Sequence, residues 1–462
     1  LPTFTCTIGQ LVVRGTIFAP HGRDADVAGA VYTLAVENRG SDAVRLTLSL
    51  EGRLGHRQAR VRTPQAFDDA HRIASLDDGV VVLEGSARPG IVALAIAADG
   101  PARVETSPSA SADGAPSYAL HRDLEVPGGG REHVAFYFAV GPERDGAEAT
   151  VAVMRRRGWR ELLTVTRDAL AALEQSTGSE GVDRLVNRNL LFAYFYGVGR
   201  ALDDAHFYLV RSRAPWHSRG VTTRDWEALC WTLPAVQLAD ASLARELLIR
   251  ACEVHGYAPG RGVHYFDGTL FEPGFSLEGA ASYAIATDRY IRDTNDDQIV
   301  EEPAVADTLY LAHDDIAARR DRRAPLYATE VTPSGAPARH AFTVHGNAVV
   351  AQALEVFRRT LDEETAKEVE DPEAVRAALV RHFTVAKEGK QLFAATADLA
   401  NAYALEDDPG ASLLWLPLFD AVQRTDSTYR RTVKALPEHA ELLAYQCARL
   451  LGPDAATVLQ WL

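Results

Sequence analysis

The chain has 462 residues, about three times the length of a typical domain, so one small fold is excluded and two domains are expected. Lysine and arginine total 48 against 63 aspartates and glutamates, a net charge of −15, which argues against a nucleic-acid-binding protein because such proteins present basic surfaces. With 47% hydrophobic and 24% charged residues, the composition excludes a disordered chain.

The first third of the chain alternates apolar and polar residues with a period of two, which indicates β-strands. Such runs, separated by Gly, Pro, Asp and Asn, occur at 8–16, 29–37, 44–50, 79–85, 90–98 and 134–140. Many short strands at this spacing predict an antiparallel β-sandwich over residues 1–152. The Ser-, Ala- and Pro-rich stretch at 106–117 is expected to be a surface loop.

From about residue 158 the hydrophobic period changes to 3.6, which indicates helices. A linker helix is predicted within 153–180. Further helices are predicted at 182–202, 224–238, 240–254, 276–294, 299–319, 340–361, 372–387, 411–423 and 438–451. Long loops rich in Trp, His, Asp, Gly and Pro lie between them, at 203–223, 257–275 and 324–340, as expected of one functional face. We therefore expect an α+β multidomain protein, an N-terminal β-sandwich followed by an (α/α)6 toroid over 181–462.

Several protein classes have no signal in the sequence. No run approaches the about 18 apolar residues that cross a bilayer. The four cysteines lie far apart, which predicts buried thiols in a reducing, cytoplasmic compartment and neither a metal site nor a disulfide framework. No GxGxxG, P-loop, HExxH or GxSxG pattern is present, so the sequence gives no support for a dinucleotide-binding protein, an NTPase, a zinc protease or an α/β-hydrolase. The oligomeric state is left open.

The first cluster of chemically distinctive residues lies at the start of a predicted helix. Its members are Trp216, Arg219, Arg224, Asp225 and Trp226. A neighbouring Arg and Asp can hold two sugar hydroxyls, since guanidinium donates and carboxylate accepts hydrogen bonds. The indoles offer flat apolar faces for a pyranose ring. The alternative is a helix-starting Asp with an ion-paired Arg.

The second cluster centres on Glu278, which opens the helix predicted at 276–294. Its apolar neighbours Phe275 and Leu277 would partly desolvate the carboxyl group and raise its pKa, as a general acid requires at neutral pH. The alternative is a first-turn glutamate that only interacts with the helix dipole.

The last two clusters carry polar groups in loops and at helix starts. Glu330, His345 and Asn347 are candidates for hydrogen bonds to a polar ligand, or for turn and capping contacts. Asp407 and Asp408 precede the Ser-Leu-Leu-Trp-Leu-Pro segment, and could accept hydrogen bonds from several hydroxyls or form a solvated loop.

The order and spacing of these clusters resemble glycoside hydrolase family 125, the exo-acting α-1,6-mannosidases, and the amylo-α-1,6-glucosidase domain of glycogen debranching enzymes. The likeness covers about residues 185–423. It implies that Arg224 and Asp225 bind the terminal sugar and that Glu278 is the general acid, where the families have Asp. Segments 329–354 and 407–418 resemble two further family-125 segments.

The resemblance also implies inversion by a second carboxylate, the general base, about 6.5–9.5 Å from the acid with water between them. In the families this Glu follows one more helix, about where this chain ends, and Glu438 and Glu441 are poor substitutes. Together with the first residues, LPTFTC, which lack an initiator Met, this suggests an incomplete natural chain.

The leading hypothesis is an exo-acting, inverting α-glycosidase that removes a terminal glucose or mannose from an oligosaccharide, without cofactor, metal, nucleic acid or membrane. Alternatives are a glycoside phosphorylase, a transglycosylase of the same architecture, and a non-catalytic carbohydrate-binding module. The sugar, the linkage and the base are not identified by the sequence.

Overall fold

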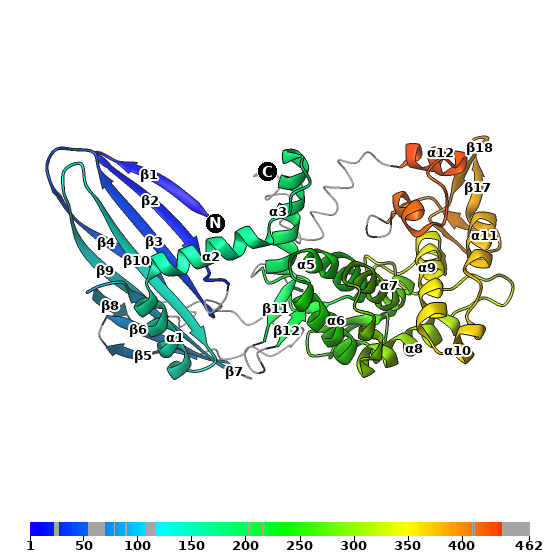
Figure 1. The fold of residues 1–462 in the computed structure, drawn as a ribbon, viewed down its shortest axis with the longest axis horizontal. Helices are drawn as coiled ribbons and strands as arrows, with labels where there is room; N and C mark the ends of the chain where they lie inside the picture. The colour runs from blue at the N-terminus through cyan, green and yellow to red at the C-terminus, as the bar shows by residue number, and fades with distance from the viewer. Residues whose placement is uncertain are drawn as a thin grey trace. The chain divides into compact units, whose positions relative to one another are not determined.

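The computed structural model describes residues 1–22, 27–53, 70–77, 79–87, 90–107, 116–201, 204, 206–214, 217, 219–408, 410 and 412–436. The chain divides into two compact units. Unit 1 comprises Leu1–Glu174 and Leu202–Asp204, and unit 2 comprises Gln175–Ala201 and Ala205–Leu462. Both antiparallel sheets and helices are present, which confirms the predicted combination (Figure 1).

Unit 1 contains two antiparallel sheets. The seven-stranded sheet has the order β1-β2-β3-β10-β7-β6-β5, and the three-stranded sheet has the order β4-β9-β8. The strands are β1 (Thr3–Ile8), β2 (Leu11–Phe18), β3 (Gly29–Asn38), β4 (Val44–Arg53), β5 (Ala70–Asp77), β6 (Val80–Ala87), β7 (Gly90–Ala98), β8 (Arg103–Ser107), β9 (Ser117–Val126) and β10 (Arg131–Gly141).

The seven-stranded sheet is covered on both faces. On one face Leu34, Phe136 and other residues share a core with Leu120 of the three-stranded sheet. On the other face Tyr137 and its neighbours pack against α1 (Arg144–Arg157) and α2 (Trp159–Leu173), through residues such as Met154 and Leu162. Alternate residues of β10 thus enter different cores, as the period of two requires.

Three details of unit 1 differ from the sequence predictions. A helix, α1, occupies residues that were assigned partly to the sandwich and partly to the linker. The run at 8–16 is two strands rather than one, because Gly9 turns the chain with φ +57°. Cys6 was expected to be buried but is exposed, since all six residues of the edge strand β1 are exposed. Most of the loop predicted at 106–117 lies outside the described residues.

Unit 2 is mainly helical. Its helices are α3 (Glu180–Tyr196), α4 (Asp225–Glu227), a π-helical turn (Ala228–Thr232), α5 (Leu233–Ala239), α6 (Ala241–His255), α7 (Leu277–Thr294), α8 (Pro303–Ala317), α9 (Val344–Thr360), α10 (Glu363–Glu368), α11 (Pro372–Phe383) and α12 (Ser427–Ala435), with 3₁₀ helices η2 (Asp297–Glu301) and η4 (Leu413–Phe419). Within the described part, no helix is both long enough and apolar enough to cross a bilayer.

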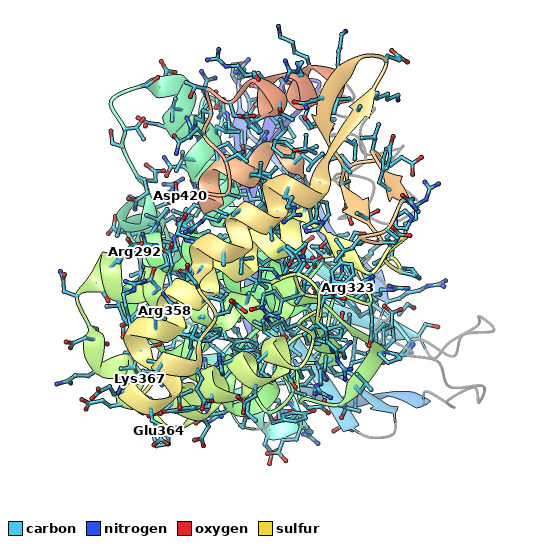
Figure 2. The ribbon with its side chains drawn as sticks, turned by 90° about the vertical axis from the view of Figure 1, so that its right-hand side faces the viewer. Arg292, Arg323, Arg358, Glu364, Lys367 and Asp420 are labelled. Carbon is cyan, nitrogen blue, oxygen red and sulfur yellow. The ribbon has the colours of Figure 1, made fainter. Side chains whose placement is uncertain are left out.

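Helices α7 and α9 form the centre of unit 2. Each buries most of its residues, and α7 packs against α8 and α9 while α9 packs against α11. Charged side chains such as Arg358, Glu364 and Lys367 lie on the exposed side of α9 and α10 (Figure 2). Of the cysteines, Cys252 is buried and Cys230 is half-buried.

Short strands replace parts of the predicted loops and helices. They are β11 (Val198–Arg200), β12 (Phe207–Leu209), β13 (Thr222–Thr223), β14 (Arg261–Tyr265), β15 (Leu270–Phe275), β16 (Phe342–Thr343), β17 (Thr384–Lys387), β18 (Lys390–Phe393), β19 (Thr396–Ala397) and β20 (Tyr403–Ala404). The helix predicted at 372–387 ends at Phe383, where β17 begins. The one predicted at 411–423 is the 3₁₀ helix η4, which contains Pro417, and the one predicted at 438–451 lies outside the described residues.

Candidate functional site

Three helices of unit 2 begin close together, and their first turns carry the main candidate residues. Asp225 begins α4, while Glu278 and His345 are the second residues of α7 and α9. Ser276 and Thr343 cap α7 and α9 by accepting hydrogen bonds from the backbone N–H groups three residues on, each at 3.2 Å. These caps hold the first turns, so the structure brings together side chains that are far apart in the sequence.

Glu278 and His345 form a direct pair. The Nδ1 atom of His345 lies 3.0 Å from Oε1 of Glu278, and the Ser276 hydroxyl donates to Oε2 at 3.2 Å. The Glu278 side chain has no exposure and that of His345 only 3%. The predicted general acid is therefore enclosed by protein, with the imidazole as its ionisable partner.

Asp225 is the second enclosed carboxyl group. It accepts hydrogen bonds from the backbone N–H of Gly260 at 2.9 Å and from the hydroxyl of Tyr283 at 3.0 Å. Burial nevertheless raises its pKa to about 7, outweighing these hydrogen bonds and the nearby charge of Arg224. Asp225 is thus a carboxyl group that gains a proton near neutral pH.

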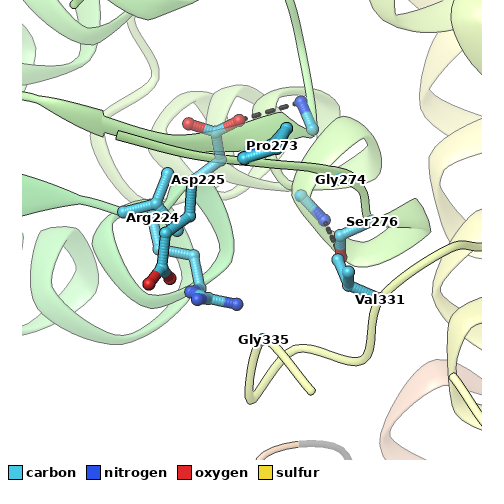
Figure 3. Close-up of a pocket in the computed structure, with 12 residues that line it drawn as sticks. Arg224, Asp225, Pro273, Gly274, Ser276, Val331 and Gly335 are labelled. Carbon is cyan, nitrogen blue, oxygen red and sulfur yellow. Dashed lines mark hydrogen bonds between the residues drawn. The ribbon is translucent and has the colours of Figure 1, made fainter. Parts of the chain in front are cut away.

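Arg224 and Asp225 line a small pocket with the β14–β15 hairpin and the loop around Gly335 (Figure 3). Arg224 donates to the carbonyl oxygen of Pro333 at 3.3 Å and lies 4.0 Å from the Glu227 carboxylate. The pocket volume is about 30 Å³, room for about one water molecule. At this volume the pocket is too small for a pyranose ring.

Trp226 lies in a cluster of aromatic rings rather than on the surface. Its ring centroid is 5.5 Å from that of His345, and its indole N–H donates to the carbonyl oxygen of Gly410 at 3.3 Å. Trp226 also lines a larger cavity of about 170 Å³, together with Trp231, Trp415, Phe419 and Arg289. This cavity is larger than the pocket lined by Arg224 and Asp225.

Asp407 and Asp408 organise the chain that leads into η4. Asp407 accepts hydrogen bonds from the Ser412 hydroxyl at 2.6 Å and from the Leu413 N–H at 2.9 Å, and Asp408 accepts from the Gly410 N–H at 2.8 Å. Burial raises the pKa of Asp407 above its ordinary value, outweighing the hydrogen bonds from Ser412 and Leu413 and the nearby His345, which lower it. Asp407 therefore belongs to the buried polar cluster and also holds Ser412, the cap residue of η4.

Two further candidates, Asn347 and Glu330, are held by protein groups. The Asn347 amide bonds only to backbone, accepting from Tyr327 N–H at 2.7 Å and donating to the carbonyl oxygens of Tyr327 and Thr343. Glu330 accepts from Arg319 at 2.7 Å and from the Phe275 N–H, and the pKa of its carboxyl group is lowered, chiefly by Arg319. These contacts correspond to the turn and capping alternative.

Arg219 is exposed and pairs with Glu272 of β15 at 3.0 Å. Trp216, Glu438 and Glu441 lie outside the described residues.

Three residues that shape the site were not predicted from the sequence. Tyr283 binds Asp225, yet nothing in an apolar helix distinguishes this tyrosine from an ordinary core residue. Ser276 was detectable, because a Ser just before a helical period is typical of an N-cap. Gly335 was also detectable, because Thr-Pro-Ser-Gly is a turn pattern and its φ of +83° suits glycine.

Comparison with known proteins reveals similarity in fold. No protein-family model and no curated protein sequence matches the chain. A bacterial glucoamylase complexed with acarbose is 11% identical, with a TM-score of 0.59 over 92% of this chain and 66% of its own. A human-microbiome protein designated a kojibiose phosphorylase is 9% identical, with a TM-score of 0.53 over 84% of this chain and 55% of its own.

A Streptococcus pneumoniae metal-independent α-mannosidase with α-1,6-mannobiose is 12% identical, with a TM-score of 0.49 over 59% of this chain and 76% of its own. The chain thus spans 66% and 55% of the length of the glucoamylase and the microbiome protein. At these identities the similarity concerns architecture, and this chain shares the fold of the glucoamylase over most of its length.

Proposed function

We propose that this chain is a carbohydrate-processing enzyme that cleaves an α-glycosidic bond and releases a terminal glucose or mannose from an oligosaccharide. The observation that carries the proposal is the convergence of buried Asp225, Glu278 and His345 at three adjacent helix starts. The fold adds support, because it is shared with a glucoamylase whose structure contains acarbose. A buried carboxyl group with an ionisable partner is the kind of group that acts as a general acid in glycoside cleavage.

In this proposal Glu278 protonates the leaving oxygen as the glycosidic bond breaks. Arg224, Asp225, Asp407 and Asp408 bind the hydroxyls of the terminal sugar. Because Glu278 is fully enclosed, the segments over the start of α7 must move when the sugar binds. No cofactor takes part, since an acid, a base and a water molecule suffice.

We also propose that the two sheets of unit 1 form a β-sandwich and that unit 2 belongs to the (α/α)6 toroid type. Buried and more exposed helices alternate along unit 2, which supports the toroid assignment. The buried helices are α7 and α9, and the more exposed ones are α6, α8 and α11. In such an arrangement the first turns of the inner helices share one rim, which is where the candidate residues lie.

A glycoside phosphorylase is the second candidate. It is favoured by the fold similarity to the protein designated a kojibiose phosphorylase, which extends over 84% of this chain. Phosphate would then take the place of the activated water, so no general base would be required. Strict dependence of turnover on phosphate distinguishes this function from hydrolysis.

The experiment is release of sugar from α-linked gluco- and manno-oligosaccharides, with and without phosphate, by the wild type and by Glu278→Gln. Loss of nearly all turnover in the variant, with sugar binding retained, is expected because Gln cannot donate a proton. Exposed Asp307 of α8 gives a matched control, Asp307→Asn, which should leave turnover unchanged. Unchanged turnover in Glu278→Gln would refute its role, and sugar binding without any release would favour a binding module.

A further inference from the structure

The pair formed by Glu278 and His345 is unusual in its enclosure. The carboxyl side chain has no exposure, and its polar partners are the Ser276 hydroxyl and His345 Nδ1. Among the described residues, the only salt-bridge partner recorded for Glu278 is His345, with no Lys or Arg within 4.0 Å. The charge state of Glu278 therefore depends on this histidine.

An ionised Glu278 beside a neutral His345 would be a buried negative charge without a compensating cation. Such a charge is very costly in a protein interior, so the group takes up a proton or acquires a cationic partner. Two arrangements that differ only by transfer of one proton between Glu278 and Nδ1 of His345 satisfy this condition. Either Glu278 is a carboxylic acid that donates to a bare Nδ1, or it is a carboxylate that accepts from the Nδ1–H of an imidazolium.

Both arrangements contain the same number of protons, and both place a hydrogen on Nε2 of His345. This atom is buried and has no hydrogen-bond partner among the described residues. The imidazole is surrounded by Trp226, Trp415 and Phe419, with ring centroids 5.4–5.9 Å away. Trp226 and Phe419 are nearly perpendicular to the imidazole, at 87°, and in such an edge-to-face contact the negative face of a ring accepts an N–H better than a lone pair.

The charged surroundings favour the same arrangement. Two carboxyl groups of the described residues lie near His345, Glu278 of α7 and Asp407 of the segment before η4. The rings that α4 and η4 contribute carry no charge. When ionised, Glu278 and Asp407 each stabilise a proton on the imidazole.

We propose that Glu278 and His345 hold one proton in common at neutral pH, with Nε2 of His345 permanently protonated. His345 is then a positioning residue that maintains the proton for Glu278. The catalytic meaning of this pair rests on the proposed function. The proton itself can be detected without substrate, so the two proposals can fail separately.

The test is NMR of the full chain with ¹⁵N-labelled histidine, followed from pH 5.5 to 8.5. We expect Nε2 of His345 to carry a hydrogen throughout, whereas Nδ1 shifts when Glu278 is changed to Gln. The signal can be assigned from its loss in His345→Asn, or from contacts with the Trp226 and Phe419 rings if that variant does not fold. A bare Nε2 with hydrogen only on Nδ1 at pH 7 would overturn the proposal.

A second measurement is a stability cycle of Glu278→Gln, His345→Phe and the double variant, with His313→Phe as the matched control. His313 is also buried and packs against an aromatic ring, Phe357. Each single variant should lower the folded-to-unfolded ratio at least tenfold, and the double variant less than the two effects combined. Additive effects would contradict a shared proton, whatever the turnover measurements show.

Discussion

Replacing Asp225 by Asn tests the buried polar cluster through its effect on stability. Asn resembles a protonated Asp in size and in hydrogen-bonding groups. It can still accept from the Gly260 N–H, and it can donate to the Tyr283 hydroxyl, which also acts as an acceptor. The substitution therefore removes the titration of this carboxyl group while keeping most of its contacts.

The magnitude follows from the raised pKa of Asp225, about 7 in the folded chain against 3.8 for an ordinary Asp. The folded state then binds more protons than the unfolded state between pH 4 and 7, so this group destabilises the fold as the pH rises through that range. Linkage gives a loss of about 3 kcal/mol in unfolding free energy between pH 5.0 and 8.5. The Asn variant should lack this loss, whereas other groups affect both proteins equally.

Urea unfolding followed by tryptophan fluorescence measures this difference, because five of the six tryptophans belong to unit 2. Curves for the wild type and Asp225→Asn should converge below about pH 4, separate progressively between pH 4 and 7, and keep a constant separation above pH 7. Asp307→Asn, at an exposed position, should remain parallel to the wild type. Parallel curves for Asp225→Asn would show that the carboxyl group is ionised at no cost, which would refute our account of its environment.

Three further changes have defined outcomes. Gly335→Ala places a Cβ atom 2.2 Å from the Arg224 guanidinium at a φ of +83°. The free energy of unfolding should fall by more than the about 1–2 kcal/mol that backbone strain alone costs, and Gly178→Ala, at an open position with positive φ, measures that strain. Burial lowers the pKa of His255 to about 4, so the unfolded chain takes up a proton on this residue before the folded chain does as the pH falls. The free energy of unfolding of the wild type should therefore fall by about 3 kcal/mol between pH 7.5 and 4.0 through this group, and His255→Gln should lack that fall. Asn347→Ala leaves buried backbone groups unpaired and should cost about 2–4 kcal/mol in thermal or urea unfolding, with or without sugar.

The sequence was most informative where local signals agreed. The helix predicted at 276–294 is observed at Leu277–Thr294, because the Ser276 cap and a continuous helical period define its start. Local signals failed where tertiary contacts decide the conformation. Residues 144–157 carry many charges and small residues, yet they form α1, because Val151 and Met154 pack on the large sheet.

The candidate site shows the same division between local and long-range information. Clusters at helix starts were recognisable, and the structure does bring Asp225, Glu278 and His345 to neighbouring first turns. The contacts between them were not predictable, since 67 residues separate Glu278 from His345 and 58 separate Asp225 from Tyr283. For Glu278 the apolar neighbours predicted partial desolvation, but the complete burial of its side chain was not predictable, because polar side chains in loop-flanked segments are ordinarily solvated.

The helix starts themselves oppose the proton that we assign to Glu278 and His345. Each helix N-terminus carries a partial positive charge, and α7 and α9 would each disfavour an added proton by about 0.3–1 kcal/mol. A carboxylate and an imidazolium about 4 Å apart attract by about 4 kcal/mol at an effective dielectric constant near 20. The observed contact of 3.0 Å is closer still, and Asp407 adds attraction of the same sign. In the carboxylate–imidazolium arrangement this attraction exceeds the combined effect of both helix ends, so the helix ends alone would not remove the proton that we propose for the pair.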